Sequence, residues 1–180
     1  MLAAGLTACN DLQAAGDKGF VSGDGVVRTI AATDRKDAVS YEGRDLDGKP
    51  LSLSSFRGTP LVVTVWGAWC TYCRADEPAV QAAADQLKGT ARFVGIDLRD
   101  SSPATALAYV RNFGVDYPSF YSPDGEAMLA FPGVLTPRSI PAFVVLDAQG
   151  RVAASIIGSL PSRRTLVELV QDVSNEATDG

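Results

Sequence analysis

The sequence contains no histidine among its 180 residues. Histidine is the side chain most often used as a general base near neutral pH, and it is a frequent zinc ligand. Its absence therefore excludes Cys–His and Ser–His dyads and every zinc site that includes a histidine. Any chemistry must come from cysteine, carboxylate, lysine, tyrosine or backbone groups.

Positive charge and long apolar runs are also scarce. The chain has 16 Lys and Arg against 21 Asp and Glu, a net charge of -5, whereas nucleic-acid binding favours clustered Lys and Arg. No window reaches the roughly 18 uninterrupted apolar residues of a membrane-spanning helix. We therefore expect no nucleic-acid partner, and membrane association only through a lipid anchor. The content of 46% hydrophobic and 21% charged residues is typical of one soluble globular domain.

Cysteine occurs three times, at Cys9, Cys70 and Cys73. The stretch Leu6-Thr7-Ala8-Cys9 resembles a bacterial lipobox, in which a peptidase cuts before the cysteine that carries the lipid. Eight residues precede Cys9 and none is Lys or Arg, so we interpret residues 1–9 as the remnant of a lipoprotein signal peptide. This predicts lipidation of Cys9 at the outer face of a bacterial cell membrane, where disulfides persist. The alternative is a stray cysteine in a flexible terminus.

The next segment is rich in Gly, Asp and Ala and has no apolar periodicity. We interpret residues 10–27 as a flexible tether and residues 28–180 as one domain. Within this domain, "YEGRDLDGKPLSLSS" has an Asp-Gly turn between alternating apolar residues, which predicts a β-hairpin. Residues 61–66 form a continuous apolar, β-branched run, which predicts a strand buried on both faces.

Helical patterns alternate with the strands that follow. Apolar spacing predicts a helix over residues 71–88, and Ser102 and Pro103 are a cap and first-turn proline for a second helix that ends at Gly114. Residues 92–98 and 117–122 are expected as strands, 124–131 as a short helix and 142–158 as two antiparallel strands before a final helix. The pattern predicts an α/β fold with a central mixed sheet flanked by helices.

Cys70 and Cys73 are three residues apart, where the buried strand ends and the first helix begins. Unpaired N–H groups and the positive end of the helix dipole stabilise a thiolate at that position. Cys73 lies nearly one turn further, shielded beneath the first turn. The spacing therefore suits an attacking Cys70 and a resolving Cys73.

Two other interpretations of the pair are weaker. A zinc site needs two further ligands that the chain does not offer. A structural disulfide across three residues would remove little entropy from the unfolded chain. We therefore expect a redox pair, with no metal and no cofactor other than the disulfide itself.

The segment "LSLSSFRGTPLVVTVWGAWCTYCRADEPAV" resembles the thioredoxin superfamily, specifically its extracytoplasmic TlpA/ResA-like branch. The later "SIPAFVVLDAQGRV" resembles the cis-proline loop of that superfamily. The similarity runs from about Asp45 to Gly158. It implies a thioredoxin-like fold with an N-terminal β-hairpin and a central insertion.

The resemblance also implies roles around the cysteines. Pro141 would be a cis-proline facing the disulfide, with the backbone of Ile140 offering hydrogen bonds to a substrate segment; alternatively, Pro141 simply begins a strand. Trp69 would flank the nucleophile as an apolar docking surface. Thr71 and Tyr72 depart from the Gly-Pro and Pro-Pro of relatives, and Tyr72 could contact substrate.

The proton acceptor is a separate question. Cytoplasmic thioredoxins have a buried Asp six residues before the first cysteine, where this chain has Thr64. The TlpA/ResA-like pattern has an acid three residues after the second cysteine, which is Asp76 here. Asp76 could take the proton of Cys73 if burial raises its pKa. Alternatively Asp76 is a solvated acid on the helix surface, and Glu77 beside it competes for the assignment.

The function expected is a membrane-tethered thiol–disulfide oxidoreductase, acting mainly as a reductase of disulfides in exported proteins. By resemblance, one client would be the Cys-x-x-Cys-His haem-attachment motif of apocytochrome c, and a membrane thiol electron donor would regenerate the enzyme. One alternative is a peroxiredoxin, although its usual P-x-x-x-T-x-x-C context is missing. Another is a non-enzymatic copper or haem chaperone that uses the thiols as soft ligands.

Overall fold

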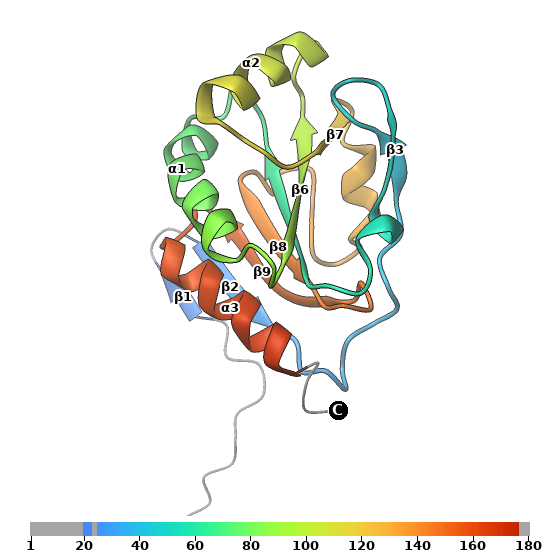
Figure 1. Cartoon of the computed structure of the whole chain (residues 1–180), viewed down its shortest axis with the longest axis vertical. Helices are drawn as coiled ribbons and strands as arrows, with labels where there is room; N and C mark the ends of the chain where they lie inside the picture. The colour runs from blue at the N-terminus through green and yellow to red at the C-terminus, as the bar shows by residue number, and fades with distance from the viewer. Residues whose placement is uncertain (1–19, 23–24, 177–180) are drawn as a thin grey trace, which may run out of the picture.

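The computed structural model describes residues 20–22 and 25–176 (Figure 1). Its described part contains a seven-stranded sheet in the order β1-β2-β9-β8-β5-β6-β7 and a separate hairpin, β3-β4. The sheet strands are β1 (Phe20–Ser22), β2 (Gly25–Thr29), β5 (Leu61–Trp66), β6 (Arg92–Leu98), β7 (Ser119–Ser122), β8 (Ala142–Leu146) and β9 (Val152–Gly158). The hairpin strands are β3 (Glu42–Arg44) and β4 (Pro50–Ser52).

Three α-helices and two 3-10 helices accompany the strands. They are α1 (Thr71–Gln86), α2 (Pro103–Phe113), α3 (Arg163–Glu176), η1 (Leu53–Phe56) and η2 (Glu126–Ala130). The expected capping of α2 is confirmed: the side chain of Ser102 accepts the N–H of Thr105, and Gly114 ends the helix at a φ of 67°. None of the helices within the described residues is both long enough and apolar enough to cross a membrane.

The sheet is mixed, as the sequence predicts. Strand β5 runs parallel to β6, and β6 parallel to β7, whereas β8 pairs with β5 in the antiparallel direction. All six residues of β5 are buried, because both of its faces are covered. Since the carboxyl ends of β5 and β6 meet at the same edge of the sheet, the segment that follows β5 lies beside the segment that follows β6.

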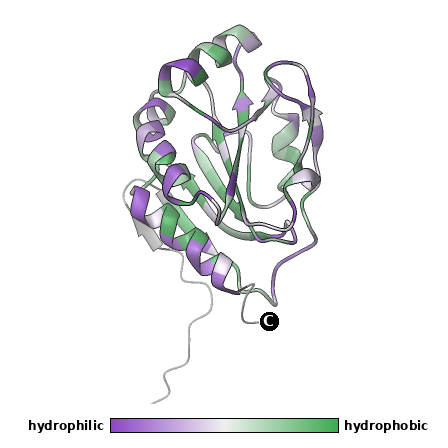
Figure 2. Cartoon of the chain, viewed as in Figure 1, coloured by the Kyte–Doolittle hydropathy of each residue, from purple (hydrophilic) through white to green (hydrophobic). Residues whose placement is uncertain are grey.

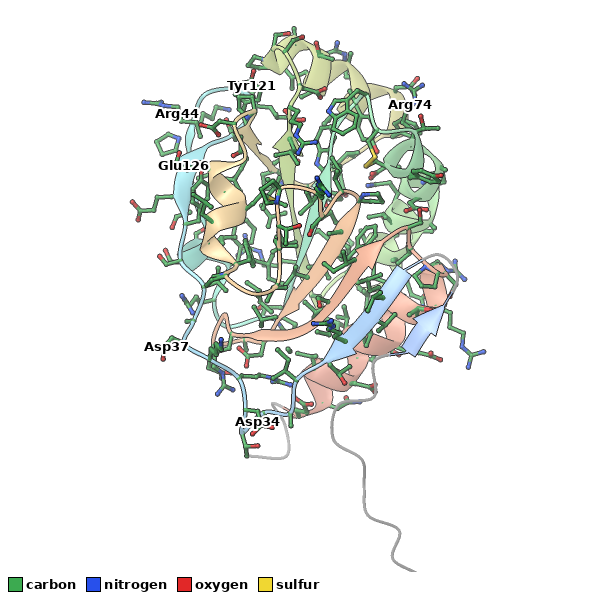
Figure 3. All side chains as sticks on the ribbon, turned by 180° about the vertical axis from the view of Figure 1, so that it is seen from behind. Asp34, Asp37, Arg44, Arg74, Tyr121 and Glu126 are labelled. Atoms are coloured by element: carbon green, nitrogen blue, oxygen red, sulfur yellow. A yellow bond between two sulfur atoms is a disulfide. The ribbon has the colours of Figure 1, made fainter. Side chains whose placement is uncertain are left out.

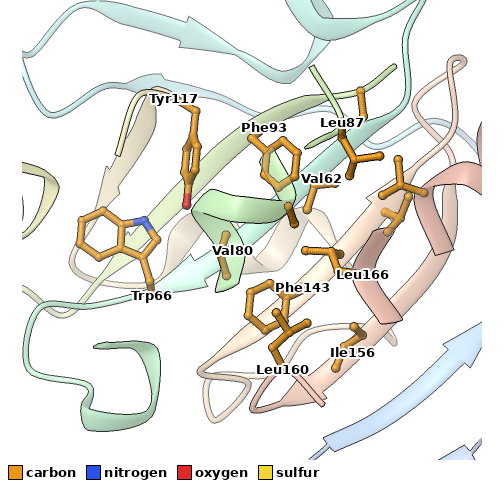
Figure 4. Packing of buried hydrophobic residues seen from close by; sticks show 14 of the residues in the cluster. Val62, Trp66, Val80, Leu87, Phe93, Tyr117, Phe143, Ile156, Leu160 and Leu166 are labelled. Carbon is orange, nitrogen blue, oxygen red and sulfur yellow. The ribbon is translucent and has the colours of Figure 1, made fainter. Parts of the chain in front are cut away.

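The two faces of the sheet are covered differently (Figure 1). The three α-helices pack on one face, in a cluster that includes Val62, Val80, Phe143 and Leu166. The hairpin and the two 3-10 helices cover the other face. In Figure 2 the central strands are mainly hydrophobic in colour, whereas the helices carry hydrophilic residues on their outer turns. Figure 4 shows Val80 projecting from α1 among the side chains that stand on the sheet.

The N-terminal part of the sheet differs from the expectation. Of the tether expected over residues 10–27, residues 20–22 form β1 and residues from Gly25 onward form β2. Strand β2 pairs with β9 from Gly25↔Gly158 to Thr29↔Ala154, and β1 pairs with β2. These strands extend the sheet because the backbone of β9 has a free edge that accepts them, a property that local composition does not reveal. The expected lipidation site at Cys9 lies outside the described residues.

Candidate active site

Cys70 and Cys73 form a disulfide, with their Cα atoms 5.2 Å apart. Cys70 is the N-cap of α1, and its Sγ accepts the backbone N–H of Cys73 at 3.1 Å. Both residues are buried, with exposed fractions of 4% and 3%. The two sulfurs therefore lie at the helix N-terminus, as the sequence predicts.

This position has a direct chemical consequence. In the reduced protein, a Cys70 thiolate would face unpaired N–H groups and the positive end of the α1 dipole, both of which lower a thiol pKa. Cys73, within the first turn, is close enough to displace a group bound to Cys70 and close the disulfide again. The arrangement can therefore exchange one protein disulfide for another.

The segment that leads to Cys70 is held by the end of β6. The backbone N–H of Ala68 donates to Oδ2 of Asp100 at 3.0 Å, and Nε1 of Trp69 donates to the carbonyl oxygen of Leu98 at 2.9 Å. A Cβ atom at Gly67 would lie 2.7 Å from that same carbonyl oxygen. Glycine is therefore required at position 67 for the indole to approach this strand.

Two aromatic side chains are exposed beside the disulfide. The exposed fraction is 49% for Trp69 and 69% for Tyr72. Large exposed hydrophobic side chains are rare in the described part of the chain, where Leu129 is the remaining example. An apolar surface next to the reactive pair suits the docking of a polypeptide; the docking roles of Trp69, Thr71 and Tyr72 stay predictions. Thr71 is exposed as well.

The bond between Ile140 and Pro141 is cis, which confirms the geometry predicted for Pro141, whereas its part in substrate binding stays a prediction. Pro141 directly precedes Ala142, which pairs with Val65 near the end of β5. This register places Pro141 at the same edge of the sheet as the segment that carries the cysteines. The carbonyl oxygen of Pro141 accepts the N–H of Gly158. Substrate binding by Ile140 stays a prediction.

The two neighbouring acids on α1 have different surroundings. Asp76 is partly exposed, and its Oδ2 accepts the backbone N–H of Leu160 at 2.9 Å. Glu77 is buried and accepts hydrogen bonds from the hydroxyl groups of Tyr109 at 2.8 Å and Tyr117 at 3.2 Å, and from Gln81 at 2.6 Å. Burial raises the pKa of Glu77, the three hydrogen bonds oppose the rise, and the charge of Asp76 adds to it.

Hydroxyl groups connect Glu77 to its surroundings. The Tyr109 hydroxyl lies 3.2 Å from the carbonyl oxygen of Cys73 as well as 2.8 Å from Glu77. The Thr64 hydroxyl donates to the Tyr117 hydroxyl at 3.5 Å. A chain of polar groups therefore runs from Thr64, the position of the missing aspartate, to Glu77. Burial also raises the pKa of both tyrosines, which remain protonated donors.

A second buried acid lies at the carboxyl end of β6. Asp97 is 0% exposed and pairs with Trp66 across the strands. Within the described residues, no donor reaches either of its carboxyl oxygens. Burial, and secondarily the adjacent carboxyl group of Asp100, raises the pKa of Asp97 to about 8. A protonated Asp97 can donate to Asp100, which in turn holds the N–H of Ala68 before the cysteines.

Sequence reasoning did not assign roles to Asp97, Asp100, Tyr109 or Tyr117. Two signals were available. Asp97 is the lone charged side chain between the apolar residues of "VGIDL", in a segment expected to be a buried strand. Glu77 lies four residues after Cys73 and three before the apolar Val80, a spacing that places it on the inward face of the helix, whereas Asp76 borders that face. Tyr109 could not be placed without knowing how α2 packs on α1, and Tyr117 could not be placed without knowing the path of the chain between α2 and β7.

Trp66 packs in the core, and its ring stacks on Tyr109 with 4.4 Å between centroids. The fold and the site together are those of a thiol–disulfide oxidoreductase with a thioredoxin-like fold, whose redox group is the Cys70–Cys73 pair. The chain belongs to the AhpC/TSA family, whose profile matches residues 35–155.

Similar proteins agree with this class. Thiol-disulfide oxidoreductase ResA from Bacillus thuringiensis is 24% identical over 124 residues, which cover 68% of this chain and 69% of that protein. The crystal structure of a secreted thiol-disulfide isomerase from Corynebacterium glutamicum is 27% identical, with a TM-score of 0.78 over 89% of this chain and 99% of that one. A DsbF homologue from Corynebacterium diphtheriae shares the fold, with a TM-score of 0.73 at 24% identity over 93% and 99% of the two chains.

Metal ligands do not gather anywhere in the described residues, where no group of three or more Cys, Asp or Glu side chains could hold an ion. The predicted resemblance to the TlpA/ResA-like branch agrees with the family match, with the similarity to ResA and with the thioredoxin-like fold.

The raised pKa of Asp97 predicts a pH-dependent stability. Between the unfolded pKa of about 4 and the folded value of about 8, the folded state holds a proton that the unfolded state has lost, so stability falls as pH rises through this window. Asp97→Asn does not titrate and can still donate to Asp100. We expect the free energy of unfolding of this variant to increase relative to that of the parent as pH rises. The measurement is urea denaturation of the oxidised proteins at pH 5, 6.5 and 8.

The matched control is Asp116→Asn, which changes an exposed acid. Its stability should run parallel to that of the parent across the three pH values. If the difference in free energy of unfolding between Asp97→Asn and the parent were also independent of pH, Asp97 would hold no extra proton in the folded state.

Proposed function

We propose that this protein is a reductase of disulfides in exported proteins, working outside the cytoplasm. The observation that carries the proposal is the N-cap position of Cys70 with Cys73 buried in the first turn behind it. The exposed rings of Trp69 and Tyr72 support a polypeptide substrate, because they offer an apolar surface beside the disulfide.

The reaction is an exchange in two steps. The Cys70 thiolate attacks one sulfur of the client disulfide, that S–S bond breaks, and one client thiolate leaves with an electron pair. The Cys73 thiol then loses its proton and attacks Cys70, the mixed disulfide breaks, and the second client thiolate leaves. Two electrons reach the client, its two thiolates take up protons, and the Cys70–Cys73 disulfide remains.

The cellular setting is part of the proposal. The lipobox-like stretch before Cys9 supports a lipid anchor on the outer face of a bacterial membrane, and the secreted thiol-disulfide isomerase among similar structures supports an exported protein. Apocytochrome c, with its Cys-x-x-Cys-His motif, is the client proposed by resemblance to the TlpA/ResA-like branch. A membrane thiol donor would restore the dithiol by the reverse exchange.

Trapping tests the division of labour between the cysteines. Reduced Cys73→Ser should form a stable mixed disulfide with a client protein through Cys70, because no thiol remains to resolve it. Cys70→Ser is the matched control and should trap little client. The complexes are counted by non-reducing electrophoresis and mass spectrometry. Equal trapping by the two variants would contradict the assignment of Cys70 as the attacking group.

The direction of electron flow is tested by redox titration of the Cys70–Cys73 pair against a thiol buffer. We expect a potential at the reducing end, roughly -270 mV, where thioredoxin lies. The readout is the fraction of alkylated protein at equilibrium. A value near the DsbA end, roughly -120 mV, would instead make the protein an oxidant of its clients.

We also propose that Asp76 accepts the proton of Cys73 during the second step, with Glu77 as the competing carboxyl group. Removing the acceptor should slow resolution most at low pH, where the thiol is otherwise protonated, and by roughly 100-fold or more if general-base catalysis is lost. Asp76→Asn and Glu77→Gln are compared by stopped-flow resolution rates from pH 6 to 9.

The two variants separate the alternatives. A changed pH profile in Asp76→Asn alone supports Asp76, and a change in Glu77→Gln alone moves the role to the buried acid. If Asp76→Asn resolves at the parent's rate at every pH, Asp76 is not the acceptor.

A further inference from the structure

A pocket of about 620 Å³ lies beside Trp69, between the segment before Cys70, the first turn of α1, and α2. Its apolar lining includes Trp69, Tyr109 and Phe113. The charged side chains in its lining are Arg74, Arg99 and Asp100. The reactive disulfide follows Trp69 directly in the chain, so a polypeptide docked on Cys70 has this pocket within reach of its neighbouring residues.

Arg99 is held at the rim of the pocket by specific contacts. Its backbone φ of 62° is left-handed, which is rare for a residue other than glycine. Its guanidinium donates to the carbonyl oxygen of Pro137 and lies 5.9 Å from the centre of the Trp69 ring. Arg99 therefore bridges the end of β6, the docking aromatic and the loop that leads to Pro141. Further N–H donors of the guanidinium remain available for a ligand.

Arg74, on the first turn of α1, is the second cation in the lining of the pocket. It follows Cys73, its backbone N–H donates to the carbonyl oxygen of Cys70 at 3.1 Å, and its guanidinium lies 6.0 Å from the ring centre of Phe113. In Figure 3, Arg74 extends from the end of α1 that carries the disulfide. The backbone contact fixes the start of the arginine side chain close to the nucleophile.

The single acid in the lining is turned to the protein. Asp100 is buried, and its Oδ2 accepts the N–H of Ala68. Its carboxyl group also lies next to that of Asp97. The exposed charges at the pocket are therefore the two arginines, although the whole chain has a net charge of -5. The two arginines therefore give the pocket a local positive charge that favours an anionic ligand there.

We propose that this pocket binds an Asp or Glu side chain of the client polypeptide, close in sequence to the client cysteine that Cys70 attacks. The inference rests on the proposed reductase function and adds a substrate preference to it. Guanidinium groups suit carboxylates because their donors match both oxygens. The rings of Trp69 and Phe113 pack against the apolar part of the client segment.

The test uses three peptides that are identical except for the residues flanking one cysteine, which are Glu, Gln or Lys. Each cysteine is joined by a disulfide to thiopyridine, a neutral leaving group whose release is measured by absorbance. The second-order rate constant of the reduced protein with each peptide is divided by that of 2-mercaptoethanol, which removes differences in the peptides' own reactivity. We expect this normalised rate constant to be highest for the Glu peptide, intermediate for Gln and lowest for Lys, with about a tenfold difference between Glu and Lys at low salt.

Variants assign the preference to the pocket. Arg99→Gln and Arg74→Gln should each reduce the Glu-to-Lys ratio several-fold, and the double variant should bring it close to one. Lys88→Gln is the matched control, since it removes one exposed positive charge just beyond the other end of α1, roughly 20 Å away. Its ratio should equal that of the parent. Because the readout is a ratio, a change in Cys70 reactivity in a variant does not affect it.

The outcomes distinguish this inference from the proposed function. A parent protein that reacts with the Gln peptide no faster than 2-mercaptoethanol does would overturn the proposed function. A parent that reacts rapidly but equally with all three peptides would overturn the inference alone. A Glu preference that survives in the double variant, or falls equally in Lys88→Gln, would mean that general electrostatic steering acts and that the pocket does not bind the acid.

Discussion

Two hydrogen bonds from the active-site segment to the end of β6 position the reactive pair. The acceptors are Asp100 and the carbonyl oxygen of Leu98, and the donors are Ala68 and the Trp69 indole. They fix the turn from a fully buried strand into α1, whose N-cap is Cys70. The same contacts bring Trp69 under Arg99 and beside the pocket. The positions of the nucleophile, the docking surface and the pocket therefore all depend on the carboxyl end of β6.

The face of the sheet under α1 and α2 is unusually polar for a core. Glu77, Asp97 and the hydroxyl groups of Tyr109 and Tyr117 are all buried there, and burying ionisable groups destabilises the fold unless they are protonated or hydrogen-bonded. Glu77 has three donors, whereas Asp97 has none within the described residues. The two acids thus meet the same constraint in different ways: Glu77 accepts hydrogen bonds, whereas the raised pKa of Asp97 favours its neutral, protonated form.

Much of the architecture could be predicted because it follows from local patterns. The apolar run of β5, the Ser102 cap, the Asp-Gly hairpin and the spacing of the cysteines each specify their own structure. Contacts between distant segments could not be predicted in this way. The pairing of β2 with β9, the tyrosines around Glu77 and the approach of Asp97 to Asp100 all depend on packing. The cis bond at Pro141 was anticipated by resemblance, since local sequence alone does not distinguish it from an ordinary strand start.

Because β1 and β2 belong to the sheet, they limit how far the folded domain can lie from a lipid anchor at Cys9. If the lipid is carried by Cys9, as proposed, eleven residue steps separate the anchor from Phe20, where the sheet begins. Fully extended, such a segment spans at most about 40 Å. The redox site would then work in a thin layer next to the membrane. Clients would then be reduced within that layer, whether they are anchored there or diffuse into it.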